Sequence, residues 1–204
     1  MSLPTLFADD TIVVVDKPAG MLSVPGRGED KADCAARRVQ AVHADALVVH
    51  RLDMATSGLL LMARGVEAQR RLGIAFAGRR VHKRYVAVVQ GLVPEACGEI
   101  DLPLIADWPR RPRQKVDPVQ GKPSLTRFRV LDTDPSAGTT RVELEPVTGR
   151  SHQLRVHLQA IGHPIVGDAL YGTAGSRLML HAAGLRFGHP MSGDEIALRS
   201  EAPF

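Results

Sequence analysis

The sequence predicts an α+β fold in which a mixed or antiparallel central β-sheet is flanked by helices and by loops around a cleft. Three observations favour this class. Short β-branched or apolar runs recur along the whole chain, stretches with helical periodicity are few, and turn-forming residues separate neighbouring runs. With 204 residues, of which 44% are hydrophobic, the chain is long enough to bury a core, and we expect a single domain over residues 1–204.

In the first half of the chain, β-branched and apolar runs predict three strands. They cover residues 11–15, 46–49 and 59–63. The continuous apolar run of the third is typical of a strand that is buried on both faces. Helices are expected over the Ala-rich residues 30–43 and over residues 65–77, whose apolar residues share one face. Gly78 follows the second helix and is expected to end it.

The second half of the chain contains more predicted strands than helices. The strands cover residues 83–90, 125–131, 140–147 and 178–187. Residues 132–138 (DTDPSAG) give a hairpin signal between two of these strands. One helix is expected over residues 152–161, with Ser151 as its N-cap and Gly162 at its end. Residues 91–101 are expected to form turns.

The charge and cysteine content limit the setting in which the protein works. Lys and Arg number 26 against 22 Asp and Glu, a balance that favours a polyanionic partner or simply a solvated basic surface. Cys34 and Cys97 form no metal-binding or redox motif and are expected to be free thiols of a reducing compartment. Because there is no signal peptide and no membrane-length apolar run, we expect a cytoplasmic protein.

Several classes of chemistry lack their motifs. His152 and His157 are five residues apart and do not share the face used by a zinc-binding helix, so no metal is expected. Glycine-rich nucleotide-binding loops and the GxSxG elbow of serine hydrolases are also missing from the sequence. Asp16 and Asp168 lie in breaker-rich turns and stay open as additional acidic candidates.

Residues 50–58 (HRLDMATSG) concentrate charged side chains on a turn of small residues just before a buried strand. A guanidinium near Asp53, from Arg51 or Arg150, would hold the carboxylate in its ionised form. An ionised carboxylate acts as a nucleophile or a base. The alternative is that Asp53 only caps the turn and pairs with an arginine.

Residues 107–115 (DWPRRPRQK) contain the only Trp, two prolines, three arginines and a lysine. The prolines exclude a helix or a central strand, so we expect an exposed basic loop. Such a loop is suited to phosphate contacts and to stacking of Trp108 on a base. The alternative is a solvated loop that Trp108 anchors by folding back onto the protein.

Three segments together resemble the signature blocks of the RluA-type RNA pseudouridine synthases. They are HRLDMATSGLLLMAR at 50–64, KRYVAVVQG at 83–91 and GRSHQLRVHLQAIGHPIVGDALYG at 149–172. Residues 13–26 and 177–190 match the flanking blocks of the family, so the resemblance covers nearly the whole chain and implies the pseudouridine synthase fold. The chain resembles the short branch of the family, and no N-terminal S4 RNA-binding domain is expected.

The resemblance implies a reaction in which a uridine of RNA is detached from its sugar at N1, rotated and reattached through C5. Asp53 matches the essential aspartate of the family, Tyr85 the tyrosine that stacks on the target base, and Arg150 the basic residue that pairs with the aspartate. Arg51 resembles the arginine that replaces the flipped base, and Leu180 lies where the family places an apolar residue under the base. The reaction is redox-neutral, so neither a cofactor nor a metal is implied.

The resemblance also implies RNA partners, namely a tRNA anticodon stem-loop and a hairpin of 23S rRNA. Further basic residues are expected to contact phosphates. They are Lys83, Arg84, Arg110, Arg111, Arg113 and Arg155. We expect a monomer without membrane contact, in which His50 supports the turn that carries Asp53. The alternative function is a non-catalytic RNA-binding or RNA-folding module on the same scaffold.

Overall fold

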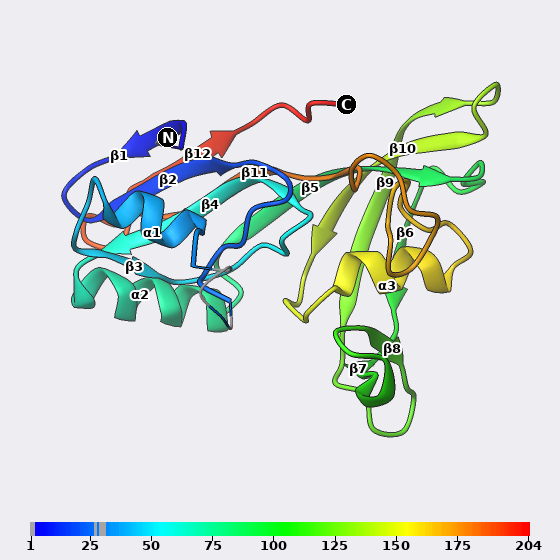
Figure 1. Cartoon of the computed structure of the whole chain (residues 1–204), viewed down its shortest axis with the longest axis horizontal. Coiled ribbons are helices and arrows are strands. Elements are labelled where there is room, and N and C mark those ends of the chain that lie inside the picture. The colour runs from blue at the N-terminus through cyan, green and yellow to red at the C-terminus, as the bar shows by residue number, and fades with distance from the viewer. Residues whose placement is uncertain (1–2, 27, 29–31) are drawn as a thin grey trace. The chain divides into compact units, whose positions relative to one another are not determined.

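The computed structural model describes residues 3–26, 28 and 32–204, and the chain divides into two compact units. Unit 1 comprises Met1–Lys83 and Ala182–Pro203, and unit 2 comprises Arg84–His181 together with Phe204. The chain passes from one unit to the other within strands β5 (His82–Gln90) and β11 (Leu180–Gly188), which are labelled in Figure 1. Each unit is described by itself below.

Unit 1 is a sheet with two helices. Its strands follow the order β1-β2-β4-β11, with β3 paired to β4 and β12 paired to β11. The strands are β1 (Thr5–Ala8), β2 (Ile12–Lys17), β3 (Ala46–Val48), β4 (Ser57–Arg64) and β12 (Glu195–Arg199). The helices are α1 (Ala35–Gln40) and α2 (Val66–Ala77), and α2 packs against β4.

The core of unit 1 follows from the two periodicities of its elements. Alternate residues of a strand point to the same face, and residues four apart on a helix share a face. Leu59 and Leu61 of β4 and Ala68 and Leu72 of α2 accordingly belong to one buried cluster. The intervening residues of β4 are buried as well, which confirms that this strand is buried on both faces.

Unit 2 contains an antiparallel sheet with the order β5-β10-β9-β6. Its further strands are β6 (Cys97–Asp101), β9 (Leu125–Asp134) and β10 (Thr139–Pro146). Helix α3 (Gln153–Ala160) packs against β9 and β10. A separate two-stranded sheet, β7 (Leu104–Ala106) with β8 (Gln114–Val116), carries the short 3₁₀ turn η2 (Trp108–Arg110) at its tip.

The structure confirms the α+β class, and the predicted strands and helices are found within a few residues of their expected bounds. Strand β6 lies where turns are expected, and strands β1 and β12 lie where no element is predicted. Residues 107–115 form the end of a β-hairpin rather than an irregular loop. In β6, Gly98 and Glu99 have low strand propensity, and hydrogen bonds to β9 determine the conformation instead.

The expected helix ends differ in detail from the structure. Helix α3 has His152 as its N-cap, in the left-handed conformation with φ of 53°, where Ser151 is expected. Helix α1 begins only after Cys34, and residues 30 and 31 of the expected helix lie outside the described residues. After α2, Arg79 rather than Gly78 is left-handed. Among the described residues, no helix is long and apolar enough to span a membrane.

Gly58, at the start of β4, is required by close contact with the neighbouring strand. Its φ of +110° lies in the region that favours glycine. A Cβ at this position would lie 2.6 Å from the backbone nitrogen of Ala182 and closer still to its carbonyl oxygen. Because both obstacles are backbone atoms of β11, no side-chain rotation relieves the overlap.

We predict that Gly58→Ala lowers the free energy of unfolding by about 3 kcal/mol or more, through strain and overpacking. Urea unfolding measures the change. The matched control is Gly73→Ala in α2, where an added Cβ meets nothing within 4 Å and the helix gains up to about 1 kcal/mol. Equal stability of Gly58→Ala and the wild type would contradict the prediction.

Candidate active site

Asp53 lies on the turn between β3 and β4, and hydrogen bonds hold this turn in place. The Thr56 N–H donates to the Asp53 carbonyl oxygen over 3.1 Å. The Ser23 hydroxyl donates to the Leu52 carbonyl oxygen over 2.7 Å and accepts from the Leu52 N–H over 3.0 Å. Leu52 is buried and Asp53 is half-buried, so the turn holds the carboxylate at the border between the core and solvent.

The side chain of Lys17, at the end of β2, is fully buried. Its ammonium group donates to three backbone carbonyl oxygens, those of Pro18 (3.0 Å), Met21 (2.8 Å) and Met54 (3.3 Å). Burial lowers the pKa of Lys17 to about 8, and the negative charges of Asp53 and Asp16 oppose this shift. Lys17 therefore joins the turn after β2 to the residue that follows Asp53, and it places a positive charge close to Asp53.

Sequence reasoning missed Lys17. A lysine in a turn rich in Pro and Gly is usually solvated, and its burial here depends on carbonyl groups from two separate turns. The signal that could have found it is its position two residues after Val15, which places Lys17 on the same buried strand face as Val13 and Val15.

His50 lies at the start of the same turn and contacts strand β4 and helix α2. Its Nε2 accepts the Leu61 N–H over 2.9 Å, and its ring stacks on Phe76 with the centroids 4.9 Å apart. Desolvation lowers the pKa of His50 to about 3, and the positive charge of Lys83 acts in the same direction. His50 is therefore neutral at physiological pH, and its ring joins the start of the turn to β4 and α2.

Tyr85 and Arg84 lie next to each other on β5 and point to opposite faces of the sheet of unit 2. Tyr85 is half-buried and stands opposite Leu144 of β10 in the strand register. The Arg84 guanidinium pairs with the Glu143 carboxylate over 3.0 Å. Leu180, at the start of β11, is buried, with 3% of its surface exposed.

Arg150 is exposed in the loop that leads into α3, and a buried glutamine fixes this loop. The Gln153 side-chain oxygen accepts from the Arg150 N–H over 3.0 Å and from the Thr148 hydroxyl over 2.7 Å. The Gln153 amide nitrogen donates to the Leu125 carbonyl oxygen over 2.9 Å. The backbone of Arg150 is thus positioned, and its exposed guanidinium donates to the Pro123 carbonyl oxygen over 3.4 Å.

The structure contradicts the expectation that Arg155 contacts phosphates. It is only 5% exposed, and its guanidinium makes two hydrogen bonds to the Asp168 carboxylate, of 2.8 and 2.7 Å. Asp168 also accepts the N–H groups of Leu170 and Tyr171. Desolvation would raise the pKa of Asp168, but these bonds outweigh it and lower the pKa. Both residues therefore stabilise the interior of unit 2.

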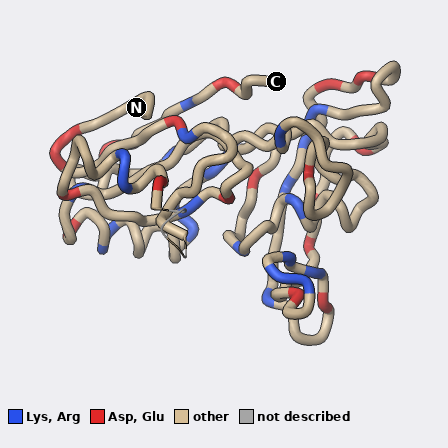
Figure 2. Tube along the Cα trace, viewed as in Figure 1, with Lys and Arg blue, Asp and Glu red and all other residues tan. Residues whose placement is uncertain are grey.

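The basic residues of the β7–β8 hairpin differ in how they are held. Arg110 pairs with the buried Asp107 over 2.7 Å, and the Arg113 guanidinium lies 5.3 Å from the centre of the Tyr171 ring. Arg111 lies over the ring of Trp108, which is 68% exposed. Trp108 is therefore not folded back as an anchor. Figure 2 shows several Lys and Arg residues gathered on this hairpin.

The predicted site residues are shared between the two units. Unit 1 holds Arg51, which is exposed, together with Asp53 and Lys83, whereas unit 2 holds Tyr85, Arg150, Leu180 and the basic hairpin. Burial lowers the pKa of Lys83. In the part of the chain that the structure describes, no three His, Cys, Asp or Glu side chains are grouped so that they could hold a metal ion.

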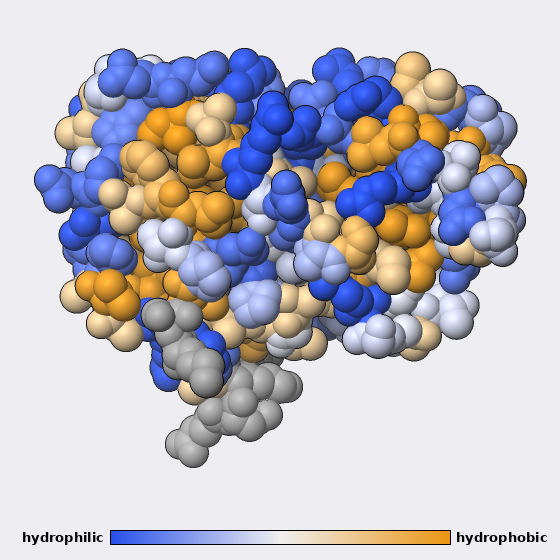
Figure 3. Space-filling view, turned by 90° about the horizontal axis from the view of Figure 1, so that it is seen from above, coloured by the Kyte–Doolittle hydropathy of each residue, from blue (hydrophilic) through white to orange (hydrophobic). Residues whose placement is uncertain are grey.

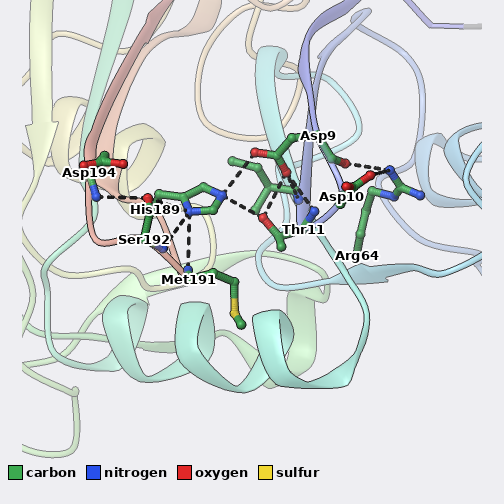
Figure 4. Close-up of polar contacts among 9 residues, drawn as sticks. Asp9, Asp10, Thr11, Arg64, His189, Met191, Ser192 and Asp194 are labelled. Carbon is green, nitrogen blue, oxygen red and sulfur yellow. Dashed lines mark hydrogen bonds and ion pairs between the residues drawn. The ribbon is translucent and has the colours of Figure 1, made fainter.

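A second polar cluster lies in unit 1, at the β1–β2 and β11–β12 turns (Figure 4). Its Ser192, His189 and Asp9 are the residue types of a hydrolase triad. Nδ1 of His189 lies 3.1 Å from the Ser192 hydroxyl, and Nε2 lies 3.1 Å from the Asp9 carboxylate. However, Nδ1 also accepts the Ser192 N–H over 3.1 Å, so its lone pair is already engaged and it is a poor base. The cluster therefore holds the β1–β2 turn against the β11–β12 turn.

A family model described as RNA pseudouridylate synthase matches residues 11–160. Three similar bacterial proteins are each named dual-specificity RNA pseudouridine synthase RluA. The protein of Vibrio parahaemolyticus is 51% identical over 195 residues, which are 92% of this chain and 78% of that protein. The protein of Escherichia coli K12 is 47% identical (99% and 94% covered), and that of Yersinia pestis is 48% identical (98% and 98%).

Solved structures show the same fold. Human RNA pseudouridylate synthase domain containing 1 superposes with a TM-score of 0.82 at 30% identity, covering 100% of this chain and 84% of the human chain. Human RNA pseudouridylate synthase domain containing 4 gives a TM-score of 0.77 at 23% identity, covering 98% and 88%. These matches confirm the pseudouridine synthase fold that the resemblance implies.

We predict that Lys17→Met lowers the free energy of unfolding by about 2–4 kcal/mol, because carbonyl groups that face Lys17 lose their buried donor. Thermal and urea unfolding measure the loss. Lys122→Met removes an exposed lysine and serves as the control, with an expected change within about 0.5 kcal/mol. A stable Lys17→Met protein would show that the turns hold without this ammonium group.

The pKa of His50 predicts a stability change in acid. Between its ordinary value of 6.5 and about 3, the unfolded chain binds a proton that the folded chain does not. His50 therefore contributes full stability above pH 6.5, and this contribution falls by roughly 1 kcal/mol per pH unit as the pH drops toward 3. Urea unfolding at pH 7 and pH 5 should show a smaller loss for His50→Gln than for the wild type; an equal loss contradicts the prediction.

Proposed function

Because the chain belongs to the RluA-type family of RNA pseudouridine synthases, we propose that it isomerises specific uridines to pseudouridine in structured RNA hairpins, with Asp53 as the essential group. The observation that carries the proposal is the turn of residues 50–58. It matches the family's signature block, and it holds Asp53 half-exposed between a buried leucine and a buried ammonium group.

The reaction conserves every atom. The N1–C1′ bond of the uridine breaks, the uracil rotates, a C5–C1′ bond forms, and the proton lost from C5 is balanced by the proton gained at N1. As the glycosidic bond breaks, positive charge develops on the sugar, and a fixed carboxylate stabilises it. Two routes are open to Asp53, which either attacks C1′ or removes the proton from C2′.

The other catalytic roles follow the family pattern. We assign Tyr85 to stacking on the uracil and to removal of the C5 proton, and Arg150 to pairing with Asp53. Leu180 provides the apolar surface under the base. Two observations support these assignments. Tyr85 is half-buried on strand β5, and the exposed Arg150 has its backbone fixed by a hydrogen bond to Gln153. The two units act together as one catalytic domain in this proposal.

Uridine within a helix must leave the stack before the enzyme can reach it, at a cost of a few kcal/mol. Arg51 is exposed beside Asp53, and its planar guanidinium is suited to take the vacated place. We assign phosphate contacts to the exposed or half-buried basic residues and withdraw Arg155 from this set. The set is Lys83, Arg84, Arg110, Arg111 and Arg113.

Two kinds of RNA are proposed as substrates, a tRNA anticodon stem-loop and a 23S rRNA hairpin. The similar bacterial proteins carry the description dual-specificity, and one of them aligns over 99% of this chain at 47% identity. Unpaired loop bases can be splayed out and stacked, which suits a base-flipping enzyme. Such RNAs place the protein in the cytoplasm, where we propose that it acts as a monomer.

We predict that Asp53→Asn folds and binds RNA but forms no pseudouridine, because the amide supplies neither the charge nor the basicity of the carboxylate. The assay is nucleotide-resolution pseudouridine mapping of tRNA and ribosomal RNA from a deletion strain. Asp10→Asn removes a fully exposed carboxylate of the same unit and should retain wild-type activity.

Three outcomes contradict the proposal in different ways. Turnover by Asp53→Asn removes Asp53 from its central role. Salt-sensitive RNA binding without any product, and equal RNA remodelling by the variant, favour a non-catalytic RNA-binding module. Release of free uracil, detected by chromatography, indicates a hydrolase instead of an isomerase.

A further inference from the structure

A pocket of about 430 Å³ lies on the β7–β8 hairpin of unit 2. Its walls are Ile105, Ala106, Trp108, Pro109, Lys115, Asp117 and Gln120, and we refer to it as the Trp108 pocket. Every wall residue comes from unit 2, and none of them is among the residues assigned above to catalysis. The volume is in the range of small-molecule sites and is sufficient for one nucleobase.

Trp108 is held in place although most of its surface is exposed. Exposed apolar residues are ordinary, and Figure 3 shows hydrophobic patches among hydrophilic residues on the face that it draws. A tryptophan that is 68% exposed gives up most of the stabilisation its burial would provide. Backbone hydrogen bonds nevertheless fix its neighbour Asp107, from the Asp107 N–H to Arg113 (2.9 Å) and from Arg110 to the Asp107 carbonyl oxygen (3.0 Å).

The walls of the pocket are suited to a flat heterocycle. Ile105, Ala106 and Pro109 are apolar, and the Trp108 indole provides a face for stacking, because Arg111 covers only one side of its ring. The Asp117 carboxylate accepts the Val119 and Gln120 N–H groups over 3.0 Å each.

Asp117 has one acceptor position left for a ligand. A carboxylate offers about four such positions, of which the two N–H groups and the Lys115 ammonium, 3.4 Å away, occupy three. The fourth is available to the amino group of a base.

The charge around the pocket matches a nucleic acid backbone. Arg110, Arg111 and Lys115 are exposed on the same hairpin, and Arg113 is half-buried beside them. Two of the four, Arg111 and Arg113, pair with no carboxylate in the described ion pairs; the Arg111 guanidinium lies on the indole, and the Arg113 guanidinium lies near the Tyr171 ring. A base that stacks on Trp108 would therefore bring its phosphates next to cations that are already in place.

We propose that the Trp108 pocket binds one unpaired base of the RNA substrate, stacked on Trp108, with Arg111 and Lys115 on the adjoining phosphates. This base is distinct from the uridine that is isomerised, and it carries an exocyclic amino group that Asp117 accepts. The inference rests on the proposed function. It adds a second contact between the protein and the RNA, and this contact determines which hairpins are modified.

Trp108 is the only tryptophan of the chain, so its fluorescence reports on the pocket directly. The experiment titrates a tRNA anticodon stem-loop into the Asp53→Asn protein, which holds the RNA without reacting. Stacking of a base quenches the emission, and a fully paired duplex of the same length leaves it unchanged. Abasic positions introduced one at a time identify the nucleotide responsible, and uridine at that position should weaken the quenching.

Variants test the pocket independently of fluorescence. Trp108→Ala should weaken binding of the same stem-loop about ten-fold, whereas Trp108→Phe should stay within about three-fold of the wild type. Val119→Ala is the matched control, because Val119 is 90% exposed in the turn after β8 and does not line the pocket. The single-turnover rate of Val119→Ala at saturating RNA should equal that of the wild type.

Two results overturn the inference. They are RNA binding that leaves the tryptophan emission unchanged, and binding by Trp108→Ala that equals that of the wild type. Failure of the proposed function gives a different result, since no pseudouridine would then form in wild-type protein whatever the emission shows. If Trp108→Ala does not fold, as judged by circular dichroism, the abasic scan with intact Trp108 still decides the question.

Discussion

The buried ammonium group of Lys17 is the interaction on which the arrangement around Asp53 depends. A cation in the interior is tolerated only when acceptors surround it, because an unpaired buried charge costs several kcal/mol. The acceptors here come from two turns, and Met54 lies 37 residues from Lys17 in the sequence. Lys17 therefore fixes the two turns relative to each other, and the backbone of Asp53 is placed with them.

Unit 2 uses buried polar groups in the same way. Gln153 binds the backbone of the loop that carries Arg150, and Arg155 with Asp168 fixes the turn that positions Tyr171. The Tyr171 hydroxyl in turn accepts the Gln114 N–H over 2.7 Å and so holds the β7–β8 hairpin at the first residue of β8, next to its turn. Apart from the buried Leu180, the proposed functional side chains are exposed or half-buried, and the groups that position them are buried.

Sequence patterns predict the elements that neighbouring residues determine. They miss the elements and contacts that depend on residues far away in the sequence. A continuous apolar run is sufficient to predict β4, apolar residues on one helix face are sufficient to predict α2, and the motif around Asp53 marks its turn. Arg155 is expected to contact phosphates because it is basic, but its partner Asp168, 13 residues further along the chain, holds it in the interior. Lys17 and β6 were missed for the same reason, since carbonyl groups of other turns and hydrogen bonds to β9 determine them.

The two units are joined through strands instead of through a linker, and this limits how the protein can be divided. β5 belongs to unit 1 at His82 and Lys83 and then pairs with β10 in unit 2, while β11 begins in unit 2 and pairs with β12 in unit 1. Any boundary between the units thus cuts two strands. Recombination between related genes cannot exchange one unit as a module unless both strands stay compatible, so the two halves are expected to be inherited together.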